Sequence, residues 1–246
     1  MSVLTLRLAG PLQSWGASAR FTRRTTESAP TKSGVVGMLA AAAGIERGDD
    51  ERLEPLAALR FGVRIDQPGT RVRDFHTAHH GVTGKSMPLS ERFYLADAVF
   101  VAALEGDRTL LAALHAALRA PVYAPYLGRR SCPPALPIEL ALHASVTSLH
   151  QALQDEPWQA APWYRRQRRR DATVSLAVLR EADDHEHHAD VLRDQPLSFA
   201  AEHRRHALRT VLSTTVEVPN PAAAPTRSAP RHDPFDALEE ESARCS

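Results

Sequence analysis

Residues 3–8, VLTLRL, alternate apolar and polar side chains. A period of two is typical of a strand with one buried face, so the stretch predicts a half-buried first strand. A second alternating stretch covers residues 59–65 and ends at the turn sequence Asp66-Gln67-Pro68-Gly69. The first quarter of the chain is therefore expected to contribute two strands to a sheet.

The stretch between these strands predicts a helix over residues 34–45. Thr31 or Ser33 can cap its first amides, and Gly44 can end it. A short second helical turn is predicted over residues 49–59. The two strands are thus joined by a helical connection.

The same order returns later in the chain. Residues 93–104 predict a strand, residues 109–118 have helical spacing of leucines, and residues 138–142 predict another strand. Together with the first half, this order gives the split β-α-β arrangement of a ferredoxin-like, α+β fold. Residues 71–90, between the halves, lack a sustained period and predict a protruding hairpin or a mobile loop.

The C-terminal half is expected to be rich in strands. A helix is predicted near residues 146–153, and strands are predicted near residues 173–179 and 206–218. The last segment, residues 219–246, is rich in Pro and Ala, is acidic and has no apolar period. We expect one domain over residues 1–218 and a disordered tail after it.

Composition excludes several classes of protein. A chain of 246 residues with 43% hydrophobic content suits one large soluble domain. The longest apolar run, residues 35–45, is about half the length of a membrane span, and residues 1–10 do not read as a secretory signal. We expect a cytoplasmic protein without membrane contact. Cys132 and Cys245 are too few for a disulfide scaffold or a zinc site.

The net charge is only +1, but the basic residues are concentrated in certain regions of the chain. Residues 1–32 carry five basic residues and one acidic residue, and residues 163–170 carry five arginines and no acid. Regional positive charge is what a phosphate-binding face requires.

The sequence gives little support for a catalytic function. Gly84-Lys85-Ser86 resembles the end of a P-loop, but His79 stands where that motif needs glycine. The acidic and histidine-rich stretch at 183–190 lacks helical ligand spacing and is interpreted as a solvated loop, so we predict no metal and no cofactor. His76, in a loop with other histidines, is left as a possible general acid or base.

Three segments combine a basic group with an aromatic ring or a glycine: Trp15 with Arg20 and Phe21, Lys32-Ser33, and residues 126–131. Such groups stack on bases, pair with phosphates or let backbone amides reach an oxyanion. Each also has a structural alternative, such as Trp15 in a small loop core or solvated arginines at 129 and 130. Taken together, the three segments favour single-stranded RNA as the ligand.

Five motifs resemble those of one known family, and the likeness is strongest over residues 3–140. In chain order they are GPLQSWG (10–16), PTKSGVVGMLAAAAGI (30–45), DFHTA (74–78), RFYLADAVF (92–100) and YLGRRSCPP (126–134). The chain resembles the CasD family, whose members are subunits of the type I-E CRISPR surveillance complex, Cascade, and belong to the RAMP superfamily.

The resemblance implies a ferredoxin-like, RNA-recognition-type palm, an inserted β-hairpin thumb at about residues 69–97 and a β-rich C-terminal extension. It also implies partners: the 5′ handle of CRISPR RNA, the Cascade backbone subunit, and the large subunit that reads the protospacer-adjacent motif, with target DNA contacted only indirectly. The residues expected at the RNA are Trp15, Arg20, Lys32, Ser33, Arg73, His76, Tyr126, Gly128, Arg129, Arg130 and Ser131.

Within this set, Arg129 and Arg130 are expected to pair with phosphates and Gly128 to admit a close backbone approach. Trp15 is expected to stack on a base. The leading hypothesis is a non-catalytic RNA-binding and assembly subunit. A metal-independent endoribonuclease using His76 or Tyr94, and a globular adaptor without RNA contact, remain as alternatives.

Overall fold

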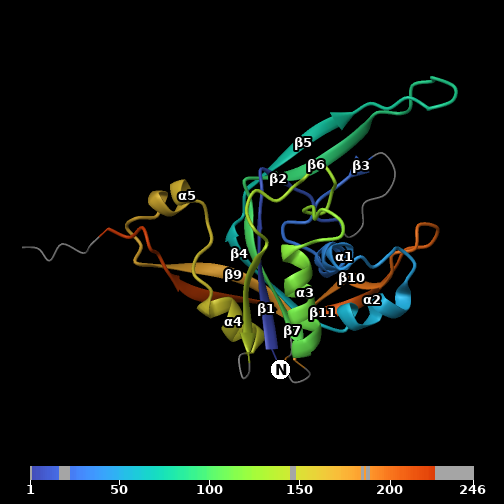
Figure 1. Ribbon diagram of the computed structural model, residues 1–246. Helices are drawn as coiled ribbons and strands as arrows, with labels where there is room; N and C mark the ends of the chain where they lie inside the picture. The colour runs from blue at the N-terminus through green and yellow to red at the C-terminus, as the bar shows by residue number, and fades with distance from the viewer. Residues whose placement is uncertain (1, 17–22, 145–147, 184–185, 187–188, 225–246) are drawn as a thin grey trace, which may run out of the picture.

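A seven-stranded sheet organises the chain (Figure 1). The computed structural model describes residues 2–16, 23–144, 148–183, 186 and 189–224. The strand order is β10-β11-β9-β4-β7-β1-β8, and neighbouring strands are antiparallel. In chain order the strands are β1 (Ser2–Ala9), β4 (Arg60–Gln67), β7 (Val99–Gly106), β8 (Glu139–Ala144), β9 (Thr173–Glu181), β10 (Asp190–Ser198) and β11 (Arg205–Pro219).

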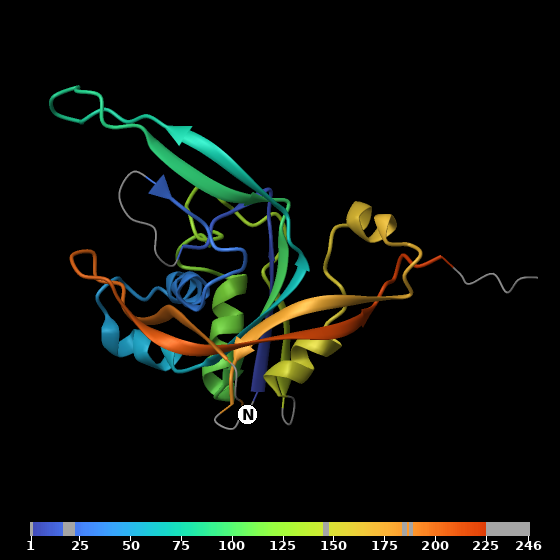
Figure 2. The same cartoon turned by 180° about the vertical axis from the view of Figure 1, so that it is seen from behind.

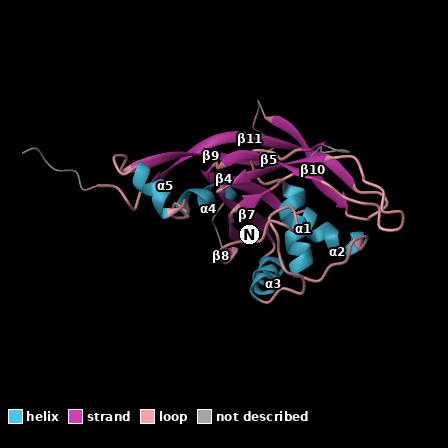
Figure 3. Ribbon diagram, turned by 90° about the horizontal axis from the view of Figure 1, so that it is seen from above, coloured by secondary structure: helices cyan, strands magenta, loops and turns pink. Residues whose placement is uncertain are grey.

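Helices cover both faces of this sheet (Figures 2 and 3). On one face α1 (Lys32–Ala42), α2 (Asp50–Ala57) and α3 (Arg108–Arg119) enclose the larger core. On the other face α4 (Leu149–Asp155) packs over a second core, and α5 (Pro162–Gln167) lies at one end of the sheet. None of the helices in the described ranges is long and apolar enough to cross a membrane.

The first strand is buried on both faces, so the prediction of a half-buried strand is wrong. Leu4 and Leu6 face the larger core, and Val3 faces the second core. Thr5 is polar but has no exposed surface, and its hydroxyl donates to the Glu156 carboxylate and accepts from the Ala141 backbone amide. A satisfied hydroxyl can lie in a core, so polar alternation did not mean solvent exposure here.

Residues 93–104 form two strands and not the single strand predicted. β6 (Ser90–Ala96) belongs to a second, small sheet, whereas β7 belongs to the main sheet. The chain turns between them at Asp97, whose φ of 56° is unusual for a residue with a side chain. The Asp97 backbone amide donates to the carbonyl oxygen of Pro11 at 3.1 Å. The backbone carbonyl of Asp97 accepts from the side-chain amide of Gln67. Side-chain pattern alone cannot show such a turn.

The stretch between the two halves is a hairpin, one of the two alternatives predicted for it. β5 (Thr70–His76) pairs with β6, which also pairs with β2 (Leu12–Gln13) and β3 (Arg23–Arg24). The hairpin projects away from the main sheet (Figure 1). At its base, Gly69 has a φ of +70°, and a Cβ there would lie 2.5 Å from the carbonyl oxygen of Ala96. Only glycine fits this point of departure.

Four elements are absent from the predictions: the two-residue strands β2 and β3, the strand β10 and the helix α5. β10 contains Pro196 and three charged residues, which is unlike a core strand but is compatible with its position at the edge of the sheet. α5 has only six residues. The chain beyond β11 bonds back to the α5 segment, because the Asn220 amide donates to the carbonyl oxygens of Arg168 and Asp171. The tail predicted over residues 219–246 lies outside the described residues from 225 onward.

A buried ion pair connects the main sheet to the α4 segment. Arg64 has no exposed surface and donates to both carboxylate oxygens of Asp66, at 2.7 and 2.9 Å. The remaining guanidinium hydrogens reach the carbonyl oxygens of Leu153, Glu156 and Pro157. Burial raises the pKa of Asp66, and the Arg64 guanidinium opposes that rise.

We predict that Asp66→Ala lowers the free energy of unfolding by about 3–5 kcal/mol, because it leaves a buried guanidinium without its counter-charge. Urea unfolding measures the change. Arg205→Ala is the matched control, since its pair with Asp50 at 3.3 Å is about half exposed and should contribute less than about 1 kcal/mol. Equal destabilisation of the two variants would contradict the structural role of the buried pair.

Candidate nucleic-acid interface

The loop over residues 126–132 is closed by its own backbone. The Leu127 amide donates to the carbonyl oxygen of Cys132 at 2.7 Å, and the Cys132 amide donates to that of Arg129 at 2.8 Å. Leu127 and Cys132 are buried, and burial raises the pKa of the Cys132 thiol. The loop therefore presents its remaining residues from a fixed base.

Gly128 allows this loop to touch the opening loop of the chain. Its φ is +86°, and a Cβ there would lie 1.8 Å from the carbonyl oxygen of Ser14. The Ser14 amide also donates to the carbonyl oxygen of Leu127 at 3.1 Å. The close backbone approach expected of Gly128 is thus made to the protein's own chain.

Trp15 is part of the core, and its predicted stacking on a base is wrong for this conformation. The residue has no exposed surface. Its indole nitrogen donates to the Gln13 side-chain oxygen at 3.0 Å, and its ring lies 2.8 Å from where a Cβ at Gly34 would stand. A base cannot reach a ring whose faces are already packed, so Trp15 positions the surrounding loops.

Lys32 is also unavailable as a phosphate partner, contrary to the prediction. It is 2% exposed, and its ammonium group donates to the Glu181 carboxylate at 2.8 Å. Burial lowers the pKa of Lys32, and Glu181 opposes that effect. Two amides at the start of α1 are likewise occupied, because Lys32 donates to Asp194 and Gly34 donates to the Thr31 hydroxyl. These amides are not free to bind an oxyanion.

Arg129 joins the loop to the small sheet. Its guanidinium lies 4.7 Å from the centre of the Tyr94 ring, and its Nη2 donates to the carbonyl oxygen of Arg24 at 2.9 Å. Its Nη1 is buried and has no hydrogen-bond partner among the described residues. Arg130 and Ser131 follow at the surface of the loop. Because the unused nitrogen is buried, the donors that this loop offers to an anion are those of the exposed Arg130 and Ser131 beside the fixed guanidinium.

The opposite face of β6 carries further arginines. Arg23 lies over the Phe93 ring at 5.4 Å, and Arg73 lies over the Phe75 ring at 4.9 Å. Both also approach Glu91, at 3.9 and 3.7 Å. These guanidinium groups are more than half exposed, so the hairpin base is cationic on this face.

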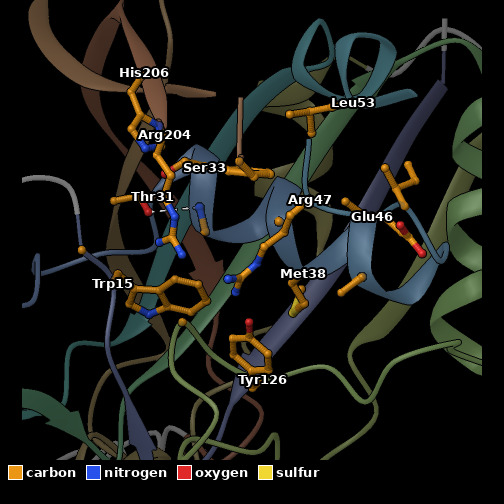
Figure 4. Close-up of a pocket in the computed structure, with 18 of the residues that line it drawn as sticks. Trp15, Thr31, Ser33, Met38, Glu46, Arg47, Leu53, Tyr126, Arg204 and His206 are labelled. Atoms are coloured by element: carbon orange, nitrogen blue, oxygen red, sulfur yellow. Dashed lines mark hydrogen bonds between the residues drawn. The ribbon is translucent and has the colours of Figure 1, made fainter. Parts of the chain in front are cut away.

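A cleft opens on the other side of Gly128 (Figure 4). It has a volume of about 250 Å³. Four predicted residues line it: Trp15, Ser33, Tyr126 and Gly128. Figure 4 shows the guanidinium groups of Arg47 and Arg204 directed toward the space between Trp15 and Tyr126.

Sequence reasoning missed three residues of this cleft: Arg47, Arg204 and His206. The two arginines are exposed and lie in connecting loops without a recognisable motif. Burial lowers the pKa of His206, Arg204 adds to this effect, and Asp194 opposes it. Arg47 and Arg204 supply positive charge to the cleft. Glu46 and Asp49 also line the cleft, on the side of α2.

The remaining predicted residues do not meet in the cleft. His76 is exposed at the end of β5, Arg73 lies on the hairpin, and Arg20 falls outside the described residues. Within the described ranges, no three His, Cys, Asp or Glu side chains are grouped to hold a metal ion. Asp183, from the acidic and histidine-rich stretch, pairs instead with Arg60 at 2.5 Å.

Comparison with known proteins identifies the family. The family model of CRISPR-associated proteins described as Cas_Cas5 matches residues 3–212. The chain belongs to the Cas5 family. It is 38% identical over 157 residues to the Cascade subunit CasD of Escherichia coli K12, a match that covers 56% of this chain and 70% of that protein. The resemblance to CasD found in the motifs is thereby confirmed.

Two solved structures resemble this Cas5 chain along most of its length. One, described as a Cas protein, is 36% identical with a TM-score of 0.67, and the match covers 90% of this chain and 97% of that one. The other, from a CRISPR RNA-guided surveillance complex, is 33% identical with a TM-score of 0.70, and the match covers 97% and 98%. The α+β fold with antiparallel sheets is therefore shared with these proteins.

We predict that Gly128→Ala destabilises this Cas5 chain more than Gly48→Ala does. Both positions have positive φ, so both variants bear a strain of about 1–2 kcal/mol. A Cβ at Gly48 meets nothing within 4 Å, whereas a Cβ at Gly128 collides with Ser14 and should cost a further 1–3 kcal/mol, approximately, by overpacking. Urea unfolding of the two variants checks the difference, and equal midpoints would disprove the close approach.

Proposed function

We propose that this chain is a non-catalytic subunit of a type I-E CRISPR surveillance complex and that it holds the 5′ handle of CRISPR RNA. The observation that carries the proposal is the fixed loop over residues 126–132, which presents the exposed Arg130 and Ser131 beside the oriented Arg129 guanidinium, between the cleft and the cationic hairpin base. The similarity to CasD and to a chain of an RNA-guided surveillance complex supports the assignment.

The proposed palm is the ferredoxin-like half of the main sheet. The order β8-β1-β7-β4, with the connection β1-α1-β4 and then β7-α3-β8, supports this interpretation. In this proposal the hairpin over residues 69–97 is the thumb, and the Cascade backbone subunit is one neighbour of the chain. The large subunit that reads the protospacer-adjacent motif is the second neighbour, and target DNA is contacted only through the complex.

The site is proposed to act through fixed positive partners. A single-stranded handle must be held in a defined path, and each phosphate needs a donor that does not move when the RNA arrives. Arg129 is held by Tyr94 and by the carbonyl oxygen of Arg24, so little side-chain entropy is lost on binding. Arg130 and Ser131 add further donors beside it. The cleft, with Arg47, Arg204 and Tyr126, is large enough to accept part of a nucleotide.

We predict that Arg129→Ala with Arg130→Ala weakens binding of an isolated handle oligonucleotide about tenfold or more. The slope of log K against log salt should flatten by about 0.7 for each phosphate that the variant no longer neutralises. Fluorescence anisotropy over a salt series measures both quantities. The control is Arg108→Ala with Arg119→Ala, which removes the same positive charge from the exposed side of α3, away from the proposed site. Arg130→Ala alone tests the site without disturbing the Tyr94 contact, and unchanged slopes would refute the phosphate role.

The endoribonuclease alternative is tested with labelled repeat RNA in the presence of a chelator. Tyr94 is 6% exposed and lies under Arg129, so it is poorly placed to act as an acid or base. We predict that the RNA is bound and stays intact over hours. Discrete cleavage that His76→Ala abolishes would overturn the non-catalytic assignment. Absence of any handle binding would instead favour the adaptor.

A further inference from the structure

We propose that the segment Trp163–Arg170 is a second binding surface, for single-stranded nucleic acid, separate from the proposed handle site. Five arginines stand within eight residues here, and Arg166, Arg168, Arg169 and Arg170 are exposed. None of the five has a carboxylate within 4.0 Å in the described part of the chain. Like charges at this density repel one another unless an anion neutralises them.

The backbone beneath these arginines is fixed. The amides of Arg168 and Arg169 donate to the carbonyl oxygens of Arg165 and Arg166, at 3.1 and 3.3 Å. Asn220 donates to the carbonyl oxygen of Arg168 at 2.8 Å, and Ala224 donates to that of Arg169 at 2.7 Å. The strand end of β11 thus holds the turn in place, so the charges are presented by a preorganised surface and not by a free tail.

An exposed aromatic ring lies beside the charges. The Trp163 residue is 45% exposed. Its ring meets Tyr164 edge-to-face at 5.6 Å, and Tyr164 in turn meets Trp158 at 6.0 Å. Trp158 is buried and donates to the carbonyl oxygen of Asp66 at 2.9 Å. The exposed indole is therefore anchored through two rings to the core.

This combination favours a nucleic acid over an acidic polypeptide. Guanidinium groups alone serve either anion, but an exposed indole next to them offers a stacking face for an unpaired base. Arg168 already lies over the Tyr164 ring at 5.5 Å, which leaves Trp163 as the open ring. A single strand supplies phosphates to the arginines and bases to the ring in alternation.

The surface is remote from the proposed handle site. All three ribbon views place α5 at the opposite end of the molecule from α1 and α2 (Figures 1, 2 and 3). The cleft is lined by residues of α1 and of the loop before α2. The inference therefore does not rest on the proposed function and requires a different ligand segment.

The test uses the full chain and a labelled poly-dT 20-mer without handle sequence, followed by anisotropy over a salt series. We expect R166Q/R169Q/R170Q to weaken binding at least tenfold and to flatten the salt slope by about 2. R108Q/R119Q/R193Q removes the same charge at exposed positions elsewhere and should change binding less than threefold. Equal effects of the two triple variants would overturn the proposal.

Two further arms separate the alternatives. Trp163→Ala should weaken binding several-fold and Trp163→Phe should restore it, because a phenyl ring still stacks. If Trp163→Ala has no effect and polyglutamate competes as well as poly-dT, the surface binds acidic polypeptides and the nucleic-acid assignment is wrong. Handle affinity should be lowered by Arg129→Ala with Arg130→Ala but not by the α5 variant, so failure of either site is visible independently.

Discussion

The backbone contact between Gly128 and Ser14 is the constraint on which the interface depends. It brings together two segments that are far apart in the chain, and it leaves no room for a side chain at position 128. The Trp15 indole fills the adjoining space against Gly34 at the start of α1. Because three segments pack around one ring, the direction of Arg129 is set by the core and not by the loop alone.

The basic side chains of this chain, whose net charge is close to zero, fall into two groups. Lys32 and Arg64 are buried, Arg209 is partly buried, and all three are matched by carboxylates, so they stabilise the connections between elements. Arg209, for example, donates to Asp194 at 2.6 Å, and Asp194 also accepts from the start of α1. The cations left for a ligand are those that are exposed or lack an acidic partner. They include the arginines around Gly128, at the hairpin base and in the α5 segment.

The sequence pattern predicted an element correctly where the residues that determine its start and end lie within or next to that element. The Thr31 cap of α1 and the positive φ of Gly44 after it agree with the predictions. The same pattern did not reveal the turn at Asp97, because the bonds that stabilise it come from Pro11 and Gln67. Four of the residues predicted for the site line one cleft, and their binding of RNA stays a prediction. Trp15 and Lys32 were misjudged because their burial depends on residues that no local window contains. Arg47 and Arg204 were missed because their loops carry no pattern, and only the fold brings them to one cleft.

The contacts of Arg129 also link the interface to the hairpin. Its guanidinium touches Tyr94 on β6 and the backbone of β3, and both strands belong to the small sheet at the hairpin base. Arg23 and Arg73 lie on the opposite face of the same β6 strand. A displacement of the hairpin base therefore moves the guanidinium groups on both faces together. A partner that fixes the hairpin would therefore also fix the spacing of these guanidinium groups.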